Sequence, residues 1–420
     1  MTERFRIGLP ETAFPFIPPA DKFLEYLGRP GGLAGMINEL GARLNQPLPD
    51  PKTVRKAVKE GVTPRSGQKI KEVLASVLTP EMHDYITSPD LTPWMESSPN
   101  NNGLAWLCMS KGEHLRIFQT DYPETFTEQF VKRRAEQEMD LFQAGLDIQK
   151  SNVTPTVFQK QWRETLKIFL RDKTRVDSSH IETGLQAAAT LQSSTGPARR
   201  EQAGLLLGLY TRLRIDFYYH LLCNVSLDLT RWFNEQNTLN NHDRQWLVEH
   251  SFFGDMVPAF DGSALTLPLE RLLDTWRRNA TQDRREVSWA KIAECLPNPY
   301  GLDADKSRAS YQTVEAREED IRKNKKSRLR EWRNGTRPDS DQLQQFIQNL
   351  VPEDSEDKDV SLATMQANVA VIWGAFVLDE WAVFDKCGLH GALSDTIPAF
   401  ERFPAYWADY QAQAARILAA

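Results

Sequence analysis

The chain has 420 residues, of which 40% are hydrophobic and 26% are charged, and its formal net charge is -6 at pH 7. This length accommodates two or three domains with hydrophobic cores, and the composition is that of a soluble protein. A negative total argues, taken alone, against a nucleic-acid-binding protein. The cysteines lie far apart without a CxxC or Cys/His spacing, so we expect free thiols in a reducing cytoplasm and no metal site. They are Cys108, Cys223, Cys295 and Cys387.

No targeting or membrane-spanning segment is predicted. The first residues contain no basic stretch followed by an apolar run, so we expect no signal peptide and a cytoplasmic protein. The most apolar segment, residues 362–384, is interrupted by two amides and two carboxylates, which are costly in lipid. They are Gln366, Asn368, Asp379 and Glu380. We interpret the segment as a core helix and expect no membrane partner.

The basic residues are concentrated in two segments. Residues 52–71 contain seven Lys or Arg and one acidic residue, and residues 322–337 contain eight and one. Basic segments on an otherwise acidic chain are expected where particular elements meet phosphate groups while the rest stays soluble. The alternative interpretation is that both segments are merely solvated helix faces.

Residues 325–352 contain a recognisable arrangement of basic, turn and apolar residues. A basic helical run ends at Asn334-Gly335, a short link reaches Pro338, and a second run places apolar side chains three and four residues apart. These side chains are Leu343, Phe346, Ile347 and Leu350. With Leu329 and Trp332 at its two apolar positions, the arrangement resembles the last two helices of Cro/repressor-like (XRE-type) helix-turn-helix modules. The resemblance covers residues 289–352, with a preceding helix at 289–296 and an unusually long linker after it.

A weaker copy of the arrangement occupies residues 32–80. Gly61 and Pro64 correspond to the later turn, and an amphipathic run follows in which Ile70, Val73, Leu74 and Val77 match the C-terminal apolar stripe. Counting back from the glycine places Val58 at the position of Trp332. The same count places Arg55 where the family has an apolar residue.

The resemblance implies binding to double-stranded DNA. Lys325, Lys326 and Arg328, at the start of the recognition helix, would face base edges or flanking phosphates in the major groove. Arg330, Arg333 and Arg337 would neutralise phosphates without reading sequence. The equivalent candidates in the N-terminal copy are Lys52, Thr53, Arg55, Lys56 and Lys59.

Hydrophobic periodicity predicts a predominantly all-α chain, in which a central helical bundle carries two helix-turn-helix-like modules. The predicted parts are a Pro-rich arm (1–20), the first module (21–80), a loop region with a small β-hairpin at 104–119 (81–121), the bundle (122–284), the second module (285–352) and aromatic-rich helices (360–420). The bundle should be built on one long helix spanning 197–234. Helices are further predicted at 21–27, 32–44, 51–60, 66–78, 125–149, 154–170, 178–192, 241–250 and 265–280.

The pair Arg214 and His220 lies on the long predicted helix. Its spacing resembles the R-x4-6-H element of HEPN ribonucleases, although an ideal helix places the two side chains about 120° apart. No phosphate-binding, dinucleotide-binding, metalloprotease or hydrolase motif occurs, and we expect no cofactor.

We therefore expect a non-catalytic DNA-binding protein, acting as a regulator or as the DNA-recognising subunit of a larger bacterial or phage-encoded assembly. One alternative is a scaffold protein whose modules only pack, and a second is a ribonuclease that uses Arg214 and His220. The aromatic segment 362–418 is expected to fill a core, or else to bind a protein partner or a second copy of the chain.

Overall fold

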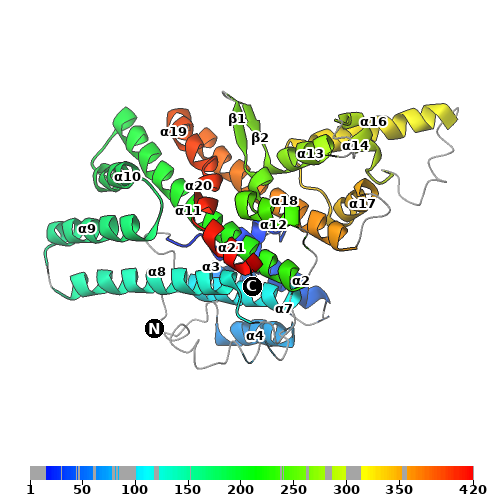
Figure 1. The fold of residues 1–420 in the computed structure, drawn as a ribbon. Coiled ribbons are helices and arrows are strands. Elements are labelled where there is room, and N and C mark those ends of the chain that lie inside the picture. Colours follow the sequence, from blue (N-terminus) through cyan, green and yellow to red (C-terminus); the bar gives the residue numbers. More distant parts are fainter. Residues whose placement is uncertain are drawn as a thin grey trace. The chain divides into compact units, whose positions relative to one another are not determined.

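The computed structural model describes most of the chain, drawn as a ribbon in Figure 1. The described residues are 16–29, 31–43, 48–59, 63–77, 101–117, 123–151, 153–236, 241–261, 264–279, 286–298, 314–351 and 357–419, together with Asn45, Glu81, Asp84 and Leu239. They are predominantly helical and include one pair of short antiparallel strands. The predicted all-α fold class is confirmed. The chain divides into two compact units.

The first unit comprises Met1–Val248, Gly388–Thr396 and Tyr406–Ala420. Its helices are α1 (Ala20–Tyr26), α2 (Gly32–Arg43), α3 (Pro51–Lys59), α4 (Pro64–Val77), α7 (Asn101–Ile117), α8 (Phe126–Lys150), α9 (Pro155–Lys173), α10 (Ser178–Thr190), α11 (Gly196–Glu235), α12 (Asn241–His250) and α21 (Gln411–Ala419). Helices α12, α19 (His390–Phe400) and α20 (Phe403–Ala408) have residues in both units. Most predicted helices lie within a turn of these bounds.

The long helix α11 is the spine of the first unit, and α8, α10 and α21 pack against it. Pro197 lies in its first turn, where a missing backbone N–H costs nothing. Near its other end, the carboxylate of Asp228 accepts hydrogen bonds from the backbone N–H groups of Phe126 (2.7 Å) and Thr127 (3.0 Å) at the start of α8. Burial raises the pKa of Asp228 to about 6. The spine thus also caps its neighbour.

The predicted N-terminal arm lies mostly outside the described residues, and its last residues are buried against α7 and α8. Phe16 and Ile17 are almost fully buried. The backbone N–H of Ile17 donates to a carboxylate oxygen of Glu138 on α8, and the Trp106 indole on α7 donates to the carbonyl of Pro18 at 2.7 Å. These contacts attach the start of α1 to the bundle.

The second unit comprises Glu249–Cys387 and Ile397–Ala405. It contains the short 3-10 helix η1 (Gly254–Met256), strands β1 (Ala259–Asp261) and β2 (Ala264–Thr266), and helices α13 (Pro268–Asn279), α14 (Trp289–Glu294), α16 (Val314–Arg333), α17 (Ser340–Leu350) and α18 (Asp357–Lys386). Helix α18 packs against α13 and α17. The predicted helix at 265–280 begins only at Pro268, because β2 occupies the residues before it.

Helix α18 contains a segment, Val360–Lys386, that is long and apolar enough to cross a membrane by length and composition alone. A core helix has the same properties, and the buried residues of α18 recur every three or four positions along one face. They are Ala367, Ala370, Trp373, Phe376, Val377, Glu380 and Phe384. The side chain of Gln366 donates to the carbonyl of Phe252 within the same unit. The aromatic side chains Trp373, Phe376 and Phe384 of this helix are buried by packing within the protein.

The predicted β-hairpin at 104–119 is wrong, because residues Asn101–Ile117 form helix α7. The Ser-Lys-Gly-Glu segment ending at Glu113 is compatible with a turn, but Trp106, Leu107 and His114 are buried at helical spacing. Among the described residues, β1 and β2 form an antiparallel pair, with Asp261 paired to Ala264.

Candidate nucleic-acid interface

The C-terminal module consists of α14, α16 and α17, and its turn has the geometry that the motif predicts. The N–H of Thr336 donates to the carbonyl of Glu331 and the N–H of Gly335 to that of Trp332, which together form a Schellman cap. Gly335 has a φ of 95°, and a Cβ atom there would lie 2.4 Å from Cδ1 of Leu378. Only glycine combines this backbone with this packing.

The apolar face of α16 packs as expected. Leu329 and Trp332 are 2% and 3% exposed, and the Trp332 ring meets the ring of Phe346 edge-on with centroids 5.6 Å apart. Leu343 and Ile347 complete the buried face of α17. The predicted core positions of this module are therefore buried, except Leu350, which is half-buried.

Helix α16 is longer than the recognition helix that we predicted, and Lys325 is not at its start. It begins at Val314, and its first half contains acidic residues, of which Glu318 and Glu319 are exposed. Residues 314–324 are mostly good helix formers, so the helix extends upstream of the basic run. These carboxylates would repel phosphate, so a contact with DNA is expected only from Lys323 onward along the helix.

Three of the predicted DNA contacts are engaged inside the unit instead. The Lys325 ammonium donates to the carbonyl of Glu294 at 2.9 Å, at the C-terminal end of α14. The Arg328 guanidinium donates to the side-chain oxygen of Gln342 on α17 at 3.3 Å.

The third engaged cation is Arg333. Its guanidinium forms an ion pair with Glu270 of α13, in which Nε lies 3.0 Å from a carboxylate oxygen. It also lies over the ring of Trp289, 3.9 Å from the centroid. These cations attach α16 to its neighbours, and a phosphate would have to displace those partners.

Among the described residues, the α16 cations Lys323, Lys326 and Arg330 are exposed and have no hydrogen-bond or ion-pair partner. Their spacing of three and four residues places them on one face of the helix. On an ideal helix this face lies about 120° from the buried and engaged side chains. Arg337, after the turn, is also exposed, and partial burial of its guanidinium lowers its pKa.

The N-terminal module consists of α2, α3 and α4, which share a small core. Its buried members are Ala34, Ile37, Val54, Ala57 and Ile70. Val54 and Ala57 are the buried residues three apart on α3, as Leu329 and Trp332 are on α16. Counting back from Gly61 places the two core positions at Val58 and Arg55, one residue too late along α3, so this prediction was wrong. The number of residues in the turn does not determine which face of the helix is buried.

The residues of α3 that were predicted to contact DNA differ in their exposure and in their internal hydrogen bonds. Lys52, Arg55 and Lys56 are exposed, whereas the side chains of Val58 and Lys59 lie outside the described residues. Thr53 is engaged in the cap of its own helix. Its hydroxyl donates to Asp50 at 2.6 Å, while the N–H groups of Lys52 and Thr53 donate to the other carboxylate oxygen.

Sequence reasoning missed exposed cations on both modules, among them Lys323, Arg65 and Lys69. Lys323 was omitted because we began the recognition helix at Lys325, although its spacing to Lys326 and Arg330 indicates a shared face. Arg65 and Lys69 on α4 are exposed, free of internal partners and four residues apart. We had assigned α4 only a packing role, but helical spacing alone would have separated these cations from Ile70.

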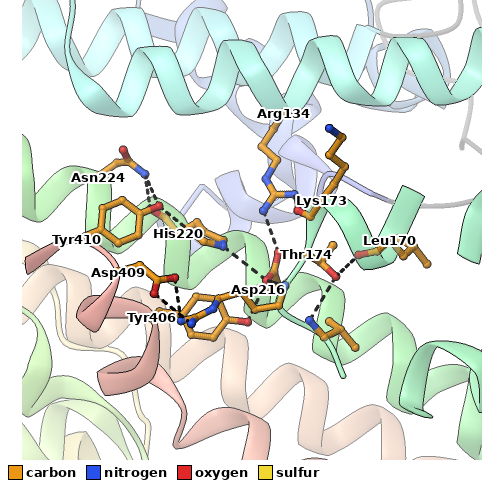
Figure 2. A network of polar contacts seen from close by, with 12 residues as sticks. Arg134, Leu170, Lys173, Thr174, Asp216, His220, Asn224, Tyr406, Asp409 and Tyr410 are labelled. Atoms are coloured by element: carbon orange, nitrogen blue, oxygen red, sulfur yellow. Dashed lines mark hydrogen bonds and ion pairs between the residues drawn. The ribbon is translucent and has the colours of Figure 1, made fainter. Parts of the chain in front are cut away.

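Arg214 and His220 do not meet within the chain. In Figure 2, His220 lies in a polar network that joins α8, α11 and the C-terminal helices. Its Nδ1 is 2.7 Å from the Tyr410 hydroxyl and its Nε2 is 3.7 Å from Asp216. Arg214 is not among its contacts and donates to the hydroxyl of Thr211 instead.

Asp216 is the centre of this network. Its carboxylate is paired with Arg134 of α8 at 2.9 Å and accepts hydrogen bonds from the N–H of Arg175 (2.8 Å) and the hydroxyl of Tyr406 (3.0 Å). Burial lowers the pKa of His220 to about 4, against the opposing effect of Asp216. A neutral, enclosed imidazole of this kind is a poor general base near pH 7. The arrangement is that of a structural network.

Comparisons with known proteins do not extend these observations. No protein-family model matches the chain, no curated protein is detectably similar to it, and no solved structure matches it. Within the described ranges, no three His, Cys, Asp or Glu side chains gather closely enough to hold a metal ion. Function is therefore inferred from the basic faces of the two modules.

Proposed function

We propose that the protein binds double-stranded DNA without catalysing a reaction. The observation that carries the proposal is the row formed by Lys323, Lys326 and Arg330 on α16. These cations have no internal partner, and they lie on the helix that ends in the turn typical of DNA-binding modules. An anionic polymer would give this row the counter-charges that the fold does not supply.

The length of the row suits a phosphate backbone. Seven residues separate Lys323 from Arg330, which corresponds to about 10 Å along a helix. Contact with three phosphates predicts that log K falls with log salt with a slope of about −2.7 for this row. Contacts from other cations would steepen the slope.

The scaffold alternative predicts an apolar outer face on this helix, where other proteins would pack. The exposed face is instead basic, and the apolar residues Leu329 and Trp332 are turned inward. The ribonuclease alternative needs Arg214 beside His220, and the latter is engaged with Tyr410 and Asp216. Charge and burial therefore favour DNA binding. We further propose that the protein acts as a regulator or as the DNA-recognising subunit of a larger assembly.

The test is a salt titration of binding to a mixed-sequence duplex. The variant Lys326→Glu/Arg330→Glu should bind at least about tenfold more weakly than wild type and flatten the salt slope by about 1.8, since it removes two phosphate contacts. The control Lys160→Glu/Lys386→Glu changes the net charge equally at two exposed lysines with no internal partner. Equal loss in both variants, or no duplex binding by wild type at low salt, would overturn the proposal.

A further inference from the structure

The described part of the chain has a second basic face, on α3, in the unit that does not contain α16. We propose that one chain holds two duplex segments at once and bridges them, one at each module. This inference rests on the proposed DNA binding and adds to it the number of DNA segments held per chain. The candidate ligand is duplex DNA at both faces, since each is a helix face on which exposed cations recur.

The face on α3 is directed away from its module's core. On an ideal helix, Lys52, Arg55 and Lys56 centre about 180° from Val54 and Ala57. The latter two are fully buried, while the three cations are exposed. Within the described ranges, the side chains of Lys52 and Arg55 have no hydrogen-bond or ion-pair partner that a phosphate would have to displace.

The two faces have matching positions relative to their cores. Arg55 directly follows the buried Val54, as Arg330 directly follows the buried Leu329. Lys52 and Lys326 each lie a few residues earlier on the same exposed face. A duplex that binds one module through these positions can bind the other module through the corresponding positions.

Each module has its own core, and the residues that anchor its basic helix lie within the same unit. In the N-terminal module the core is Ile37, Val54 and Ile70 with their neighbours, and Asp50 caps α3. In the C-terminal module the anchors of α16 are Glu270 and the carbonyl of Glu294. Neither face borrows a described side chain from the other module, so the two faces should bind independently.

The distribution of charge favours two separate contacts over one continuous contact. The basic segments 52–71 and 322–337 stand in a chain whose net charge is -6, so the remaining residues are strongly acidic in total. Phosphate contact is therefore expected at each basic face and not at the acidic remainder of the chain.

The experiment is a bridging assay with the full chain. A duplex of about 20 base pairs, two helical turns, is immobilised on beads, and a fluorescent duplex of the same sequence is added with protein at low salt. Wild type should retain the fluorescent duplex. The variants Lys52→Glu/Arg55→Glu and Lys326→Glu/Arg330→Glu should each still bind a single duplex but retain about tenfold less of the second one.

Two controls separate bridging by one chain from bridging by association of two chains. The charge-matched variant Lys160→Glu/Lys386→Glu should bridge like wild type. An equimolar mixture of the two module variants should not regain bridging, because each chain keeps one intact face. Circular dichroism checks that each Glu variant is folded. Where one is not, the milder variant Lys52→Gln/Arg55→Gln or Lys326→Gln/Arg330→Gln replaces it.

The outcomes distinguish this inference from the proposed function. Single-duplex binding by wild type without bridging would overturn two-segment binding and leave DNA binding standing. Regained bridging in the mixture, or full bridging by either module variant, would also overturn it, because association of chains would then be the cause. No binding of any duplex by wild type would overturn both.

Discussion

Helices α3 and α16 occupy corresponding places in two modules, yet they use their basic residues differently. On α3 the described cations Lys52, Arg55 and Lys56 all face outward, opposite the core. On α16, Arg333 and Lys325 are bound to α13 and α14, and only part of the basic run is free. The copy with the weaker sequence match thus has the more uniformly exposed basic face.

The difference follows from what surrounds each helix. Helix α3 has nine residues and, in the described part of the chain, packs mainly against α2 and α4, so one apolar stripe is enough to hold it. Helix α16 has twenty residues and packs against α13 and α14 as well as holding α17 through Trp332. A longer helix with more neighbours needs more anchors, and long basic side chains supply them. The number of charges in a motif therefore overstates the number that a ligand meets.

The largest expected effects are in the two module cores, where the helices are alike. Ile70→Ala and Leu343→Ala remove side chains that are 0% and 2% exposed, and each should lower the free energy of unfolding by about 3 kcal/mol. Hydrogen exchange should show faster opening confined to the mutated module. Ile168→Ala, at a side chain that is 58% exposed, is the control and should change stability by under about 0.5 kcal/mol. Opening that spreads to both modules would contradict independent cores.

The next largest effect is expected in the turn after α16. Gly335→Ala places a Cβ in a left-handed backbone and against Leu378 and Leu267, at a cost of about 2–3 kcal/mol. Urea denaturation should show a lower midpoint. Gly112→Ala, on helix α7 with open space around it, should instead stabilise by up to about 1 kcal/mol. An unchanged urea midpoint for Gly335→Ala would mean that the turn can relax around the added Cβ atom.

Single cations on α16 sharpen the distinction between free and engaged residues. Lys326→Ala should flatten the salt slope of DNA binding by about 0.9 and leave stability unchanged. Arg333→Ala should leave the slope unchanged and lower stability by about 1–2 kcal/mol, since it breaks the contacts with Glu270 and Trp289. Salt titration and urea denaturation of both variants provide the test. A flatter slope for Arg333→Ala would show that DNA displaces its partners.

The smallest effect is one of pH and concerns only α3. Hydrogen bonds from the Thr53 side chain and from the Thr53 and Lys52 N–H groups lower the pKa of Asp50 below its ordinary 3.8. The folded state therefore holds this proton more weakly than the unfolded chain, so the stabilisation is complete above pH 3.8 and is lost as the pH falls below it. Amide hydrogen exchange in the first turn of α3 should therefore accelerate below pH 3.8. The Lys325 contact of α16 is to a backbone carbonyl, which does not titrate, so exchange in α16 should not accelerate through this contact. An Asp50→Asn variant should lack the acceleration, and the same acceleration in that variant would exclude the carboxylate as its cause.

Much of this architecture follows from local pattern. The helical periodicity around Leu343 and Phe346 predicted the buried face of α17, and the Asn334-Gly335 pair predicted the turn that ends α16. Prediction failed where two structures share one local pattern. Residues 104–117 combine apolar residues with a Ser-Lys-Gly segment, which suits a hairpin or a helix, and the buried contacts of Trp106 favour the helix.

The sequence by itself determined that the chain is helical, that it carries two basic segments, and that each is followed by a turn and an amphipathic helix, because propensity, spacing and turn chemistry act between near neighbours. Only the tertiary structure decided which cations are free. Arg333 and Lys326 are both basic residues of one helix, and what separates them is Glu270, sixty-three residues away from Arg333 along the chain. A partner at such a distance has no local signature. For this protein, the candidate DNA-binding surface is therefore what remains after the fold has taken the cations that it needs.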